Sequence, residues 1–116
     1  MEMGRLRKSF SCAIAGLVYC VKTEKNMKIH ILAMIVVVIA ALVVGLNPVE
    51  WGLLILTVFM VLVAETVNTA VEKTVDLVTI EYHPLAKLAK NLAAGAVLLA
   101  AIGSLAMAVV IFGPHI

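Results

Sequence analysis

Three carboxylates and one amide recur at helical spacing in an otherwise apolar part of the chain: Glu65, Asn68, Glu72 and Asp76. On a helix that turns about 100° per residue, they fall within an arc of about 80° and form one stripe. Each ionisable group inside a bilayer costs at least a few kcal/mol, so this polar stripe must face protein, metal or water. Glu72 and Asp76, beside Lys73, also fit a solvated helix face, but Glu65 lies too deep for that interpretation.

The depth of each side chain along the helix indicates its chemistry. Glu65 is the deepest, and a carboxylate in apolar surroundings can take up a proton, so Glu65 is a candidate general base. Glu72 and Asp76 lie about 10 and 16 Å farther along the helix axis, where hard oxygen ligands suit a Mg²⁺ ion carried by phosphates. Such a stripe would let the hydroxyl group of an amphiphile meet a water-soluble phosphoryl donor.

Composition places this stripe in a membrane protein. The 116 residues are 64% hydrophobic and only 14% charged, with a net charge of +2. Soluble domains are about 45–50% apolar and about 25% charged, so the composition excludes an ordinary soluble domain, a disordered chain and a nucleic-acid-binding module. We therefore expect one all-α integral-membrane domain over residues 1–116 that binds no nucleic acid.

Three segments are long and apolar enough to cross a bilayer of about 30 Å: residues 29–46, 51–78 and 85–112. The middle segment carries the polar stripe in its second half. Basic residues lie before the first segment and between the second and third, at Arg5, Arg7, Lys8, Lys22, Lys25, Lys28, Lys73, Lys87 and Lys90. Because basic residues favour the cytoplasmic side, this pattern predicts a multi-pass protein of a bacterial cytoplasmic membrane, with the N-terminus inside and the C-terminus outside.

The N-terminal segment, residues 5–22, carries apolar residues on one helical face, among them Leu6, Phe10 and Leu17. This pattern predicts an amphipathic helix on the membrane surface. A signal peptide is the alternative interpretation, although Ser9 and Ser11 interrupt its apolar stretch.

Few other residues have side chains that would bind a ligand or take part in a reaction. Lys90 stands at the mouth of the third segment, where it would meet a phosphate or act as an interfacial anchor. His30 and His83 have no second histidine or cysteine at a ligand spacing, so His30 is expected at the interface and His83 in a turn. Cys12 and Cys20 are expected to be reduced. No phosphate-binding glycine loop is present, so any nucleotide must be held by other means.

The residues also resemble a known family. The segments Ala64–Val78 (AETVNTAVEKTVDLV), Glu81–Leu98 (EYHPLAKLAKNLAAGAVL) and Thr23–His30 (TEKNMKIH) are similar to the small prokaryotic diacylglycerol kinases. The block E-x-x-N-[ST]-A-[IV]-E-x-x-V-D is highly specific, and the resemblance covers nearly the whole chain. The segment EYHPLAK…AAGAVL is closer in sequence to the Gram-positive branch of the family, whose members phosphorylate undecaprenol.

The resemblance implies a homotrimer with a surface helix, three membrane helices per protomer and active sites shared between neighbours. It makes Glu65 the catalytic base, Glu24 and Glu72 the ligands of Mg²⁺ on ATP, and a further group the nucleotide or substrate contacts: Arg5, Lys8, Asn68, Asp76, Lys90 and Asn91. The family has Asp where this chain has Asn91, which removes a negative charge beside Lys90. Asn91 is compatible with a natural variant of weak activity, an inactive homologue, or an introduced substitution.

The expected activity is ATP-dependent phosphorylation of a membrane lipid alcohol, with undecaprenol as the first candidate and diacylglycerol as the second. A small oligomeric ion or proton channel, with the polar stripe lining its pore, is the alternative from another class. Replacement of Glu65 by Gln would separate the two classes, because it would change conductance in a channel and abolish phosphate transfer in a kinase.

Overall fold

Residues 2–116, which the computed structural model describes, form helices joined by short loops. Four helices and one short 3-10 turn follow each other: α1 Glu2–Thr23, α2 Lys25–Val44, α3 Pro48–Val78, α4 Pro84–Phe112 and η1 Gly113–His115. The predicted all-α class is confirmed, and α2, α3 and α4 are each long and apolar enough to cross a membrane.

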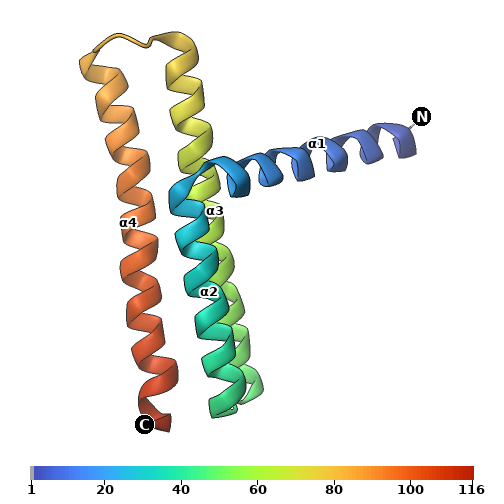
Figure 1. Cartoon of the computed structure of the whole chain (residues 1–116), viewed down its shortest axis with the longest axis vertical. Coiled ribbons are helices and arrows are strands. Elements are labelled where there is room, and N and C mark those ends of the chain that lie inside the picture. The colour runs from blue at the N-terminus through green and yellow to red at the C-terminus, as the bar shows by residue number, and fades with distance from the viewer. Residues whose placement is uncertain (1) are drawn as a thin grey trace.

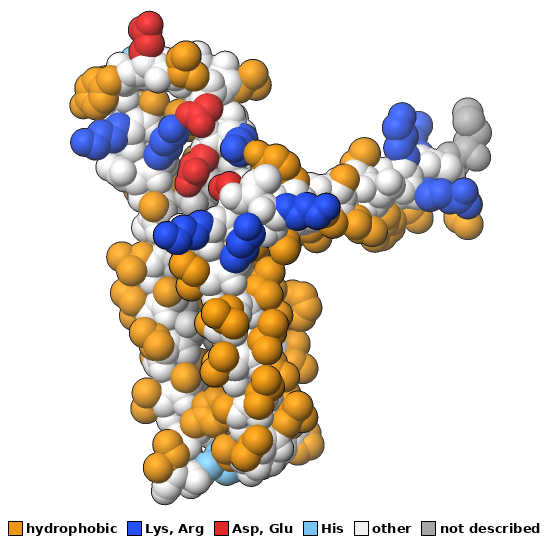
Figure 2. Space-filling view, viewed as in Figure 1, with side chains coloured by type: hydrophobic (Ala, Val, Ile, Leu, Met, Phe, Trp, Pro, Cys, Tyr) orange, Lys and Arg blue, Asp and Glu red, His pale blue; other side chains and the backbone are white. Residues whose placement is uncertain are grey.

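Three helices stand side by side and the first projects away from them (Figure 1). The hairpin of α3 and α4 extends beyond the point at which α1 turns into α2, so one end of the bundle consists of these two helices alone. Hydrophobic side chains cover the part of the bundle below α1, whereas Lys, Arg, Asp and Glu gather at the level of α1 and above it (Figure 2). At the level of α1, the charged end of the hairpin is therefore separated from the apolar part of the three-helix bundle, which we call the apolar shaft.

Local sequence signals set the helix ends. The second helix starts at Lys25, earlier than the 29–46 range expected from hydropathy, because the extended backbone of Glu24 interrupts the helix between α1 and α2. It ends at Val44, before the 46 expected from hydropathy, and is capped by Gly45, whose positive φ of 80° suits a residue without a Cβ. The third helix begins at Pro48 instead of 51, because Asn47 and Glu50 form a capping box around the first turn.

The last membrane helix begins at Pro84, one residue before the expected 85–112 range. The backbone N–H of Leu85 donates to Nδ1 of His83 at 3.1 Å, so His83 is the turn residue that its position before proline suggested. The first helix runs over Glu2–Thr23, slightly beyond the expected 5–22 at both ends.

The end of the bundle away from the charged hairpin is closed by a small core and a polar contact. Ala41, Leu54 and Ile111, one from each membrane helix, form the core. Beside it, Nε2 of His115 lies 2.9 Å from Oε2 of Glu50, which ties η1, directly after α4, to the start of α3. These contacts fix the three helices relative to each other at the end opposite the polar stripe.

The first helix is attached to the bundle by its last turns. Sγ of Cys20 lies 3.6 Å from Oγ1 of Thr69, and both residues are buried. Nearby, Nζ of Lys73 lies 5.5 Å from the centre of the Tyr19 ring. Both contacts are made with α3 next to the polar stripe, so the α1–α2 junction is held beside the candidate site.

Candidate functional site

The polar stripe of α3 becomes steadily more exposed toward the charged hairpin. Glu65 and Asn68 are buried, at 2% and 5% exposure, Glu72 is half-buried and Asp76 is exposed. This order in exposure matches the order in depth expected from the sequence. The stripe therefore runs along one face of α3 from the buried carboxyl group of Glu65 to the more exposed carboxylates of Glu72 and Asp76.

Glu65 lies among polar groups from α2, from α3 and from the junction of α1 and α2. Its Oε2 atom lies 3.5 Å from Nε2 of His30 on α2. The charges of Glu72 and of Glu24, at the junction of α1 and α2, also act on it. The fold thus places Glu24 near the stripe, although nothing in its own spacing marked it as more than a charge before a membrane helix.

Asn68 connects the deep and shallow parts of the stripe. Its Nδ2 atom donates to Oε1 of Glu72 at 2.9 Å, which fixes the side-chain amide. Its Oδ1 atom, and Oε2 of Glu65, are buried and have no hydrogen-bond partner among residues 2–116. Each of these unsatisfied acceptors calls for a donor or a cation beside it, such as an N–H group, a hydroxyl group or a metal.

Glu24 and Glu72 have carboxylate oxygens that suit a metal ion whose other ligands are phosphate oxygens and water. No group of three or more His, Cys, Asp or Glu side chains among residues 2–116 is arranged to hold a metal. Mg²⁺ in nucleotide sites is commonly held by one or two carboxylates together with phosphate oxygens and water. The residues present therefore fit Mg²⁺ bound to a nucleotide and do not fit an independent metal site.

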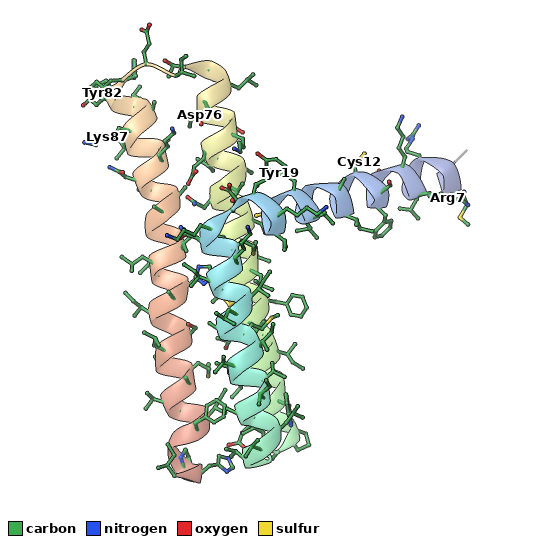
Figure 3. All side chains as sticks on the ribbon, viewed as in Figure 1. Arg7, Cys12, Tyr19, Asp76, Tyr82 and Lys87 are labelled. Carbon is green, nitrogen blue, oxygen red and sulfur yellow. The ribbon has the colours of Figure 1, made fainter. Side chains whose placement is uncertain are left out.

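Lys90 meets the stripe from α4. Its Nζ atom donates to Oδ1 of Asp76 at 2.6 Å. Beside this pair, a cavity of about 270 Å³ opens between the ends of α3 and α4, and Asp76, Lys90 and Asn91 are among its lining residues. Figure 3 shows Asp76 and Lys87 on the two helices at this end of the bundle. The cavity is polar, carries both signs of charge and lies at the exposed end of the stripe.

Arg5 and Lys8 are not brought to the stripe. Both are exposed on α1, and Arg5 precedes Cys20, the residue that anchors α1, by about 22 Å of helix. Figure 3 shows the neighbouring Arg7 near the free end of this helix, away from the bundle. Within one chain these basic residues are therefore remote from Glu65.

An apolar groove approaches Glu65 from the opposite direction. It has a volume of about 170 Å³ and is lined by all three membrane helices, from Leu54 and Ser104 up to His30. Because His30 contacts Glu65, the groove leads from the apolar shaft toward the deep end of the polar stripe. An apolar chain and a polar reacting group could thus reach Glu65 from opposite sides.

Comparison with known proteins decides the family. Residues 11–112 match the family described as prokaryotic diacylglycerol kinase. The chain belongs to the prokaryotic diacylglycerol kinase family. As a lipid kinase, it uses a nucleotide as phosphoryl donor, so the comparisons support the kinase interpretation of its acidic stripe.

The names of individual relatives indicate two different substrates. The undecaprenol kinase of Bacillus subtilis is 40% identical over 115 residues, which cover 99% of this lipid kinase and 94% of that protein. The diacylglycerol kinase of Synechocystis is 45% identical over 97 residues, or 83% of this chain and 55% of the relative. The diacylglycerol kinase of Escherichia coli K12 is 36% identical over 70 residues, or 60% of this chain and 57% of the relative. The alignments thus span little more than half of these two diacylglycerol kinases.

Sequence reasoning missed one residue next to Glu65 of this lipid kinase. His30 was expected at the membrane interface, but it lies 3.5 Å from Glu65 with a side chain only 19% exposed. Its partner is 35 positions away in the sequence, so no helical spacing could connect them. The available signal was a titratable residue inside a run of apolar residues at the start of a membrane helix.

Proposed function

We propose that this lipid kinase transfers the γ-phosphoryl group of ATP to undecaprenol, giving undecaprenyl phosphate. The substrate choice is supported by the B. subtilis undecaprenol kinase, whose alignment covers nearly all of both chains. The observation that carries the mechanism is the burial of the Glu65 carboxyl group, at 2% exposure, at the deep end of the polar stripe.

In the proposed reaction, Glu65 acts as general base. Its carboxylate accepts the proton of the terminal hydroxyl group, and the hydroxyl oxygen forms a bond to the γ-phosphorus as the bond to the ADP oxygen breaks. The unsatisfied Oδ1 of Asn68, one turn away, would contact a phosphate-bound cation. Holding the hydroxyl and the phosphate together supplies much of the rate enhancement.

The nucleotide would occupy the exposed part of the stripe. Glu24 and Glu72 would hold Mg²⁺, which neutralises charge on the phosphates when bound. Asp76, Lys90 and Asn91 line the cavity between α3 and α4 and would contact the nucleotide. Lys90 supplies a flexible positive charge for a phosphate.

The apolar groove below His30 would receive the first part of the lipid chain. Its occupant must bring a hydroxyl group to Glu65 and continue into the hydrocarbon, as an isoprenoid alcohol does. The lining of the groove is mostly apolar, with His30, Thr57 and Ser104 as its polar residues, which suits a hydrocarbon chain.

We propose a homotrimer with the N-terminus and the charged hairpin on the cytoplasmic side of a bacterial membrane. A second groove of about 770 Å³, between α3 and α4, has small residues of α4 on one side, among them Ala96, Ala100 and Gly103, and larger apolar residues of α3 such as Phe59 on the other, and it would accept a helix of a neighbouring protomer. Hydrophobic side chains along the lower edge of α1 face the same way as the apolar shaft, which supports a surface helix (Figure 2). Arg5 and Lys8 on α1 would then contribute to a neighbour's site.

The test is phosphate transfer from labelled ATP to undecaprenol or diacylglycerol in mixed micelles of the purified protein. We expect undecaprenol to be the better acceptor, by kcat/KM. Glu65→Gln keeps the size of the side chain but removes the base, so it should abolish transfer while a fluorescent ATP analogue still binds. A preference for diacylglycerol would overturn the substrate assignment, and full activity of Glu65→Gln would overturn the mechanism.

A further inference from the structure

Two groups beside Glu65 can donate a hydrogen bond to it, the amide of Asn68 and the imidazole of His30, and of these two only His30 can carry a positive charge. Its Nε2 atom lies 3.5 Å from Oε2 of Glu65, the same oxygen that has no hydrogen-bond partner among residues 2–116. The other charges acting on Glu65 come from the carboxylates of Glu72 and Glu24, and Asn68 contributes an amide. The surroundings of the base thus contain two further acids, one amide and one imidazole.

The separation of 3.5 Å is slightly long for a hydrogen bond, which normally spans about 2.7–3.2 Å. Catalytic hydrogen bonds are often long before substrate binds and shorten in the reacting complex. A carboxylate has two oxygens, and a general base needs only one of them for the proton it removes. An imidazole held on the other oxygen would fix the direction in which the reacting oxygen points.

The place of His30 in the fold supports this role. It lines the upper end of the apolar groove between α2, α3 and α4, and it also contacts the base. A lipid alcohol whose chain lies in that groove must therefore pass His30 before its hydroxyl group reaches Glu65. The imidazole stands where the path of the lipid and the base meet.

We propose that His30 is a positioning residue for the phosphoryl-transfer reaction: Nε2–H of His30 donates to Oε2 of Glu65 and leaves Oε1 to accept the proton of the lipid hydroxyl. This inference rests on the proposed function of Glu65 as the base. It assigns to His30 no contact with ATP and no part in metal binding. The contribution of His30 is therefore expected in the chemical step.

The test compares three substitutions at this position in steady-state transfer from labelled ATP to undecaprenol. His30→Ala should lower kcat about 10- to 100-fold, because misplacing a reacting group by about 1 Å has effects of this size. The apparent KM for ATP should stay within about twofold. His30→Gln places an amide N–H near the position of Nε2 and should recover much of the loss, whereas His30→Asn, whose amide is shorter and reaches only the region of Nδ1, should not.

His115→Ala is the matched control, because His115 also pairs with a glutamate of α3, but at the opposite end of the bundle. It should leave kcat within about twofold. Equal loss of kcat in the Ala, Gln and Asn variants of His30, unchanged kcat in His30→Ala, or a loss confined to the KM for ATP would each overturn the role of His30. Failure of the wild-type protein to phosphorylate any lipid alcohol would instead overturn the proposed function.

Discussion

Nζ of Lys90 lies 2.6 Å from Oδ1 of Asp76, and this contact joins α4 to α3 at the exposed end of the polar stripe. The two side chains are 42% and 48% exposed, so solvent screens their attraction. Exposed ion pairs contribute about 0–1 kcal/mol to stability. We infer that the pair matters chiefly by holding a positive charge at the cavity between the two helices.

Lys90→Ala should therefore impair catalysis more than folding. We expect transfer to fall about 100-fold or more, as for removal of one group that stabilises charge in a transition state, and the thermal midpoint in detergent to change little. Lys87→Ala on the same helix is the matched control and should give a smaller loss. Comparable losses in both variants would show that the lysines act only as interfacial anchors.

Asn91→Asp restores the carboxylate that the family pattern has at this position. Asn91 lines the same cavity as Lys90, so an added negative charge there would complement the lysine or a phosphate-bound cation. We expect a severalfold increase in kcat for phosphate transfer. An unchanged rate would show that the position tolerates either residue in this protein.

Glu24→Gln and Glu72→Gln should weaken the response to magnesium. Each substitution removes one charged ligand, so the free Mg²⁺ concentration that gives half-maximal activity should rise about 10-fold or more, and kcat at saturating Mg²⁺ should recover in part. Glu2→Gln, at the far end of α1, is the charge-matched control. An unaltered Mg²⁺ dependence in the Glu24 and Glu72 variants would remove both residues from the proposed metal site.

Asn47→Ala should destabilise the fold without acting on the site directly. The Asn47 side chain accepts a hydrogen bond from the Glu50 N–H at 2.8 Å, and loss of such a cap destabilises proteins by about 1 kcal/mol. Thermal unfolding in detergent should therefore shift downward, with the KM for ATP unchanged. Asn26→Ala, exposed in the first turn of α2, should not lower the midpoint.

The sequence was sufficient to predict the features that depend on neighbours along one helix. The spacing of Glu65, Asn68, Glu72 and Asp76 placed them on one face, and their order along the chain matched the observed order of exposure. The three membrane helices followed from hydropathy and length. In each case, the period of a helix and the thickness of a bilayer were the only physical facts required.

Contacts between helices could not be derived in the same way. The pairs His30–Glu65 and Cys20–Thr69 join residues that are far apart in the sequence, and they depend on how the helices cross. Glu24 was assigned to the site through the family resemblance, because a single charge before a membrane helix has no distinguishing spacing. The contact of α1 with α3 beside Thr69 is what brings that junction to the stripe.

The length of α3 makes bilayer thickness a variable in catalysis. Its 31 residues extend about 46 Å, which exceeds a hydrocarbon core of about 30 Å. If the polar contacts of Glu50 hold one end at the water boundary, Glu65 lies about 22 Å along the axis and about 8 Å short of the opposite boundary. Hydrophobic mismatch would then move the base toward the headgroups in thin bilayers and away from them in thick ones. We expect the acyl-chain length of the host lipids to set how readily a hydroxyl group and a phosphate meet at this carboxylate.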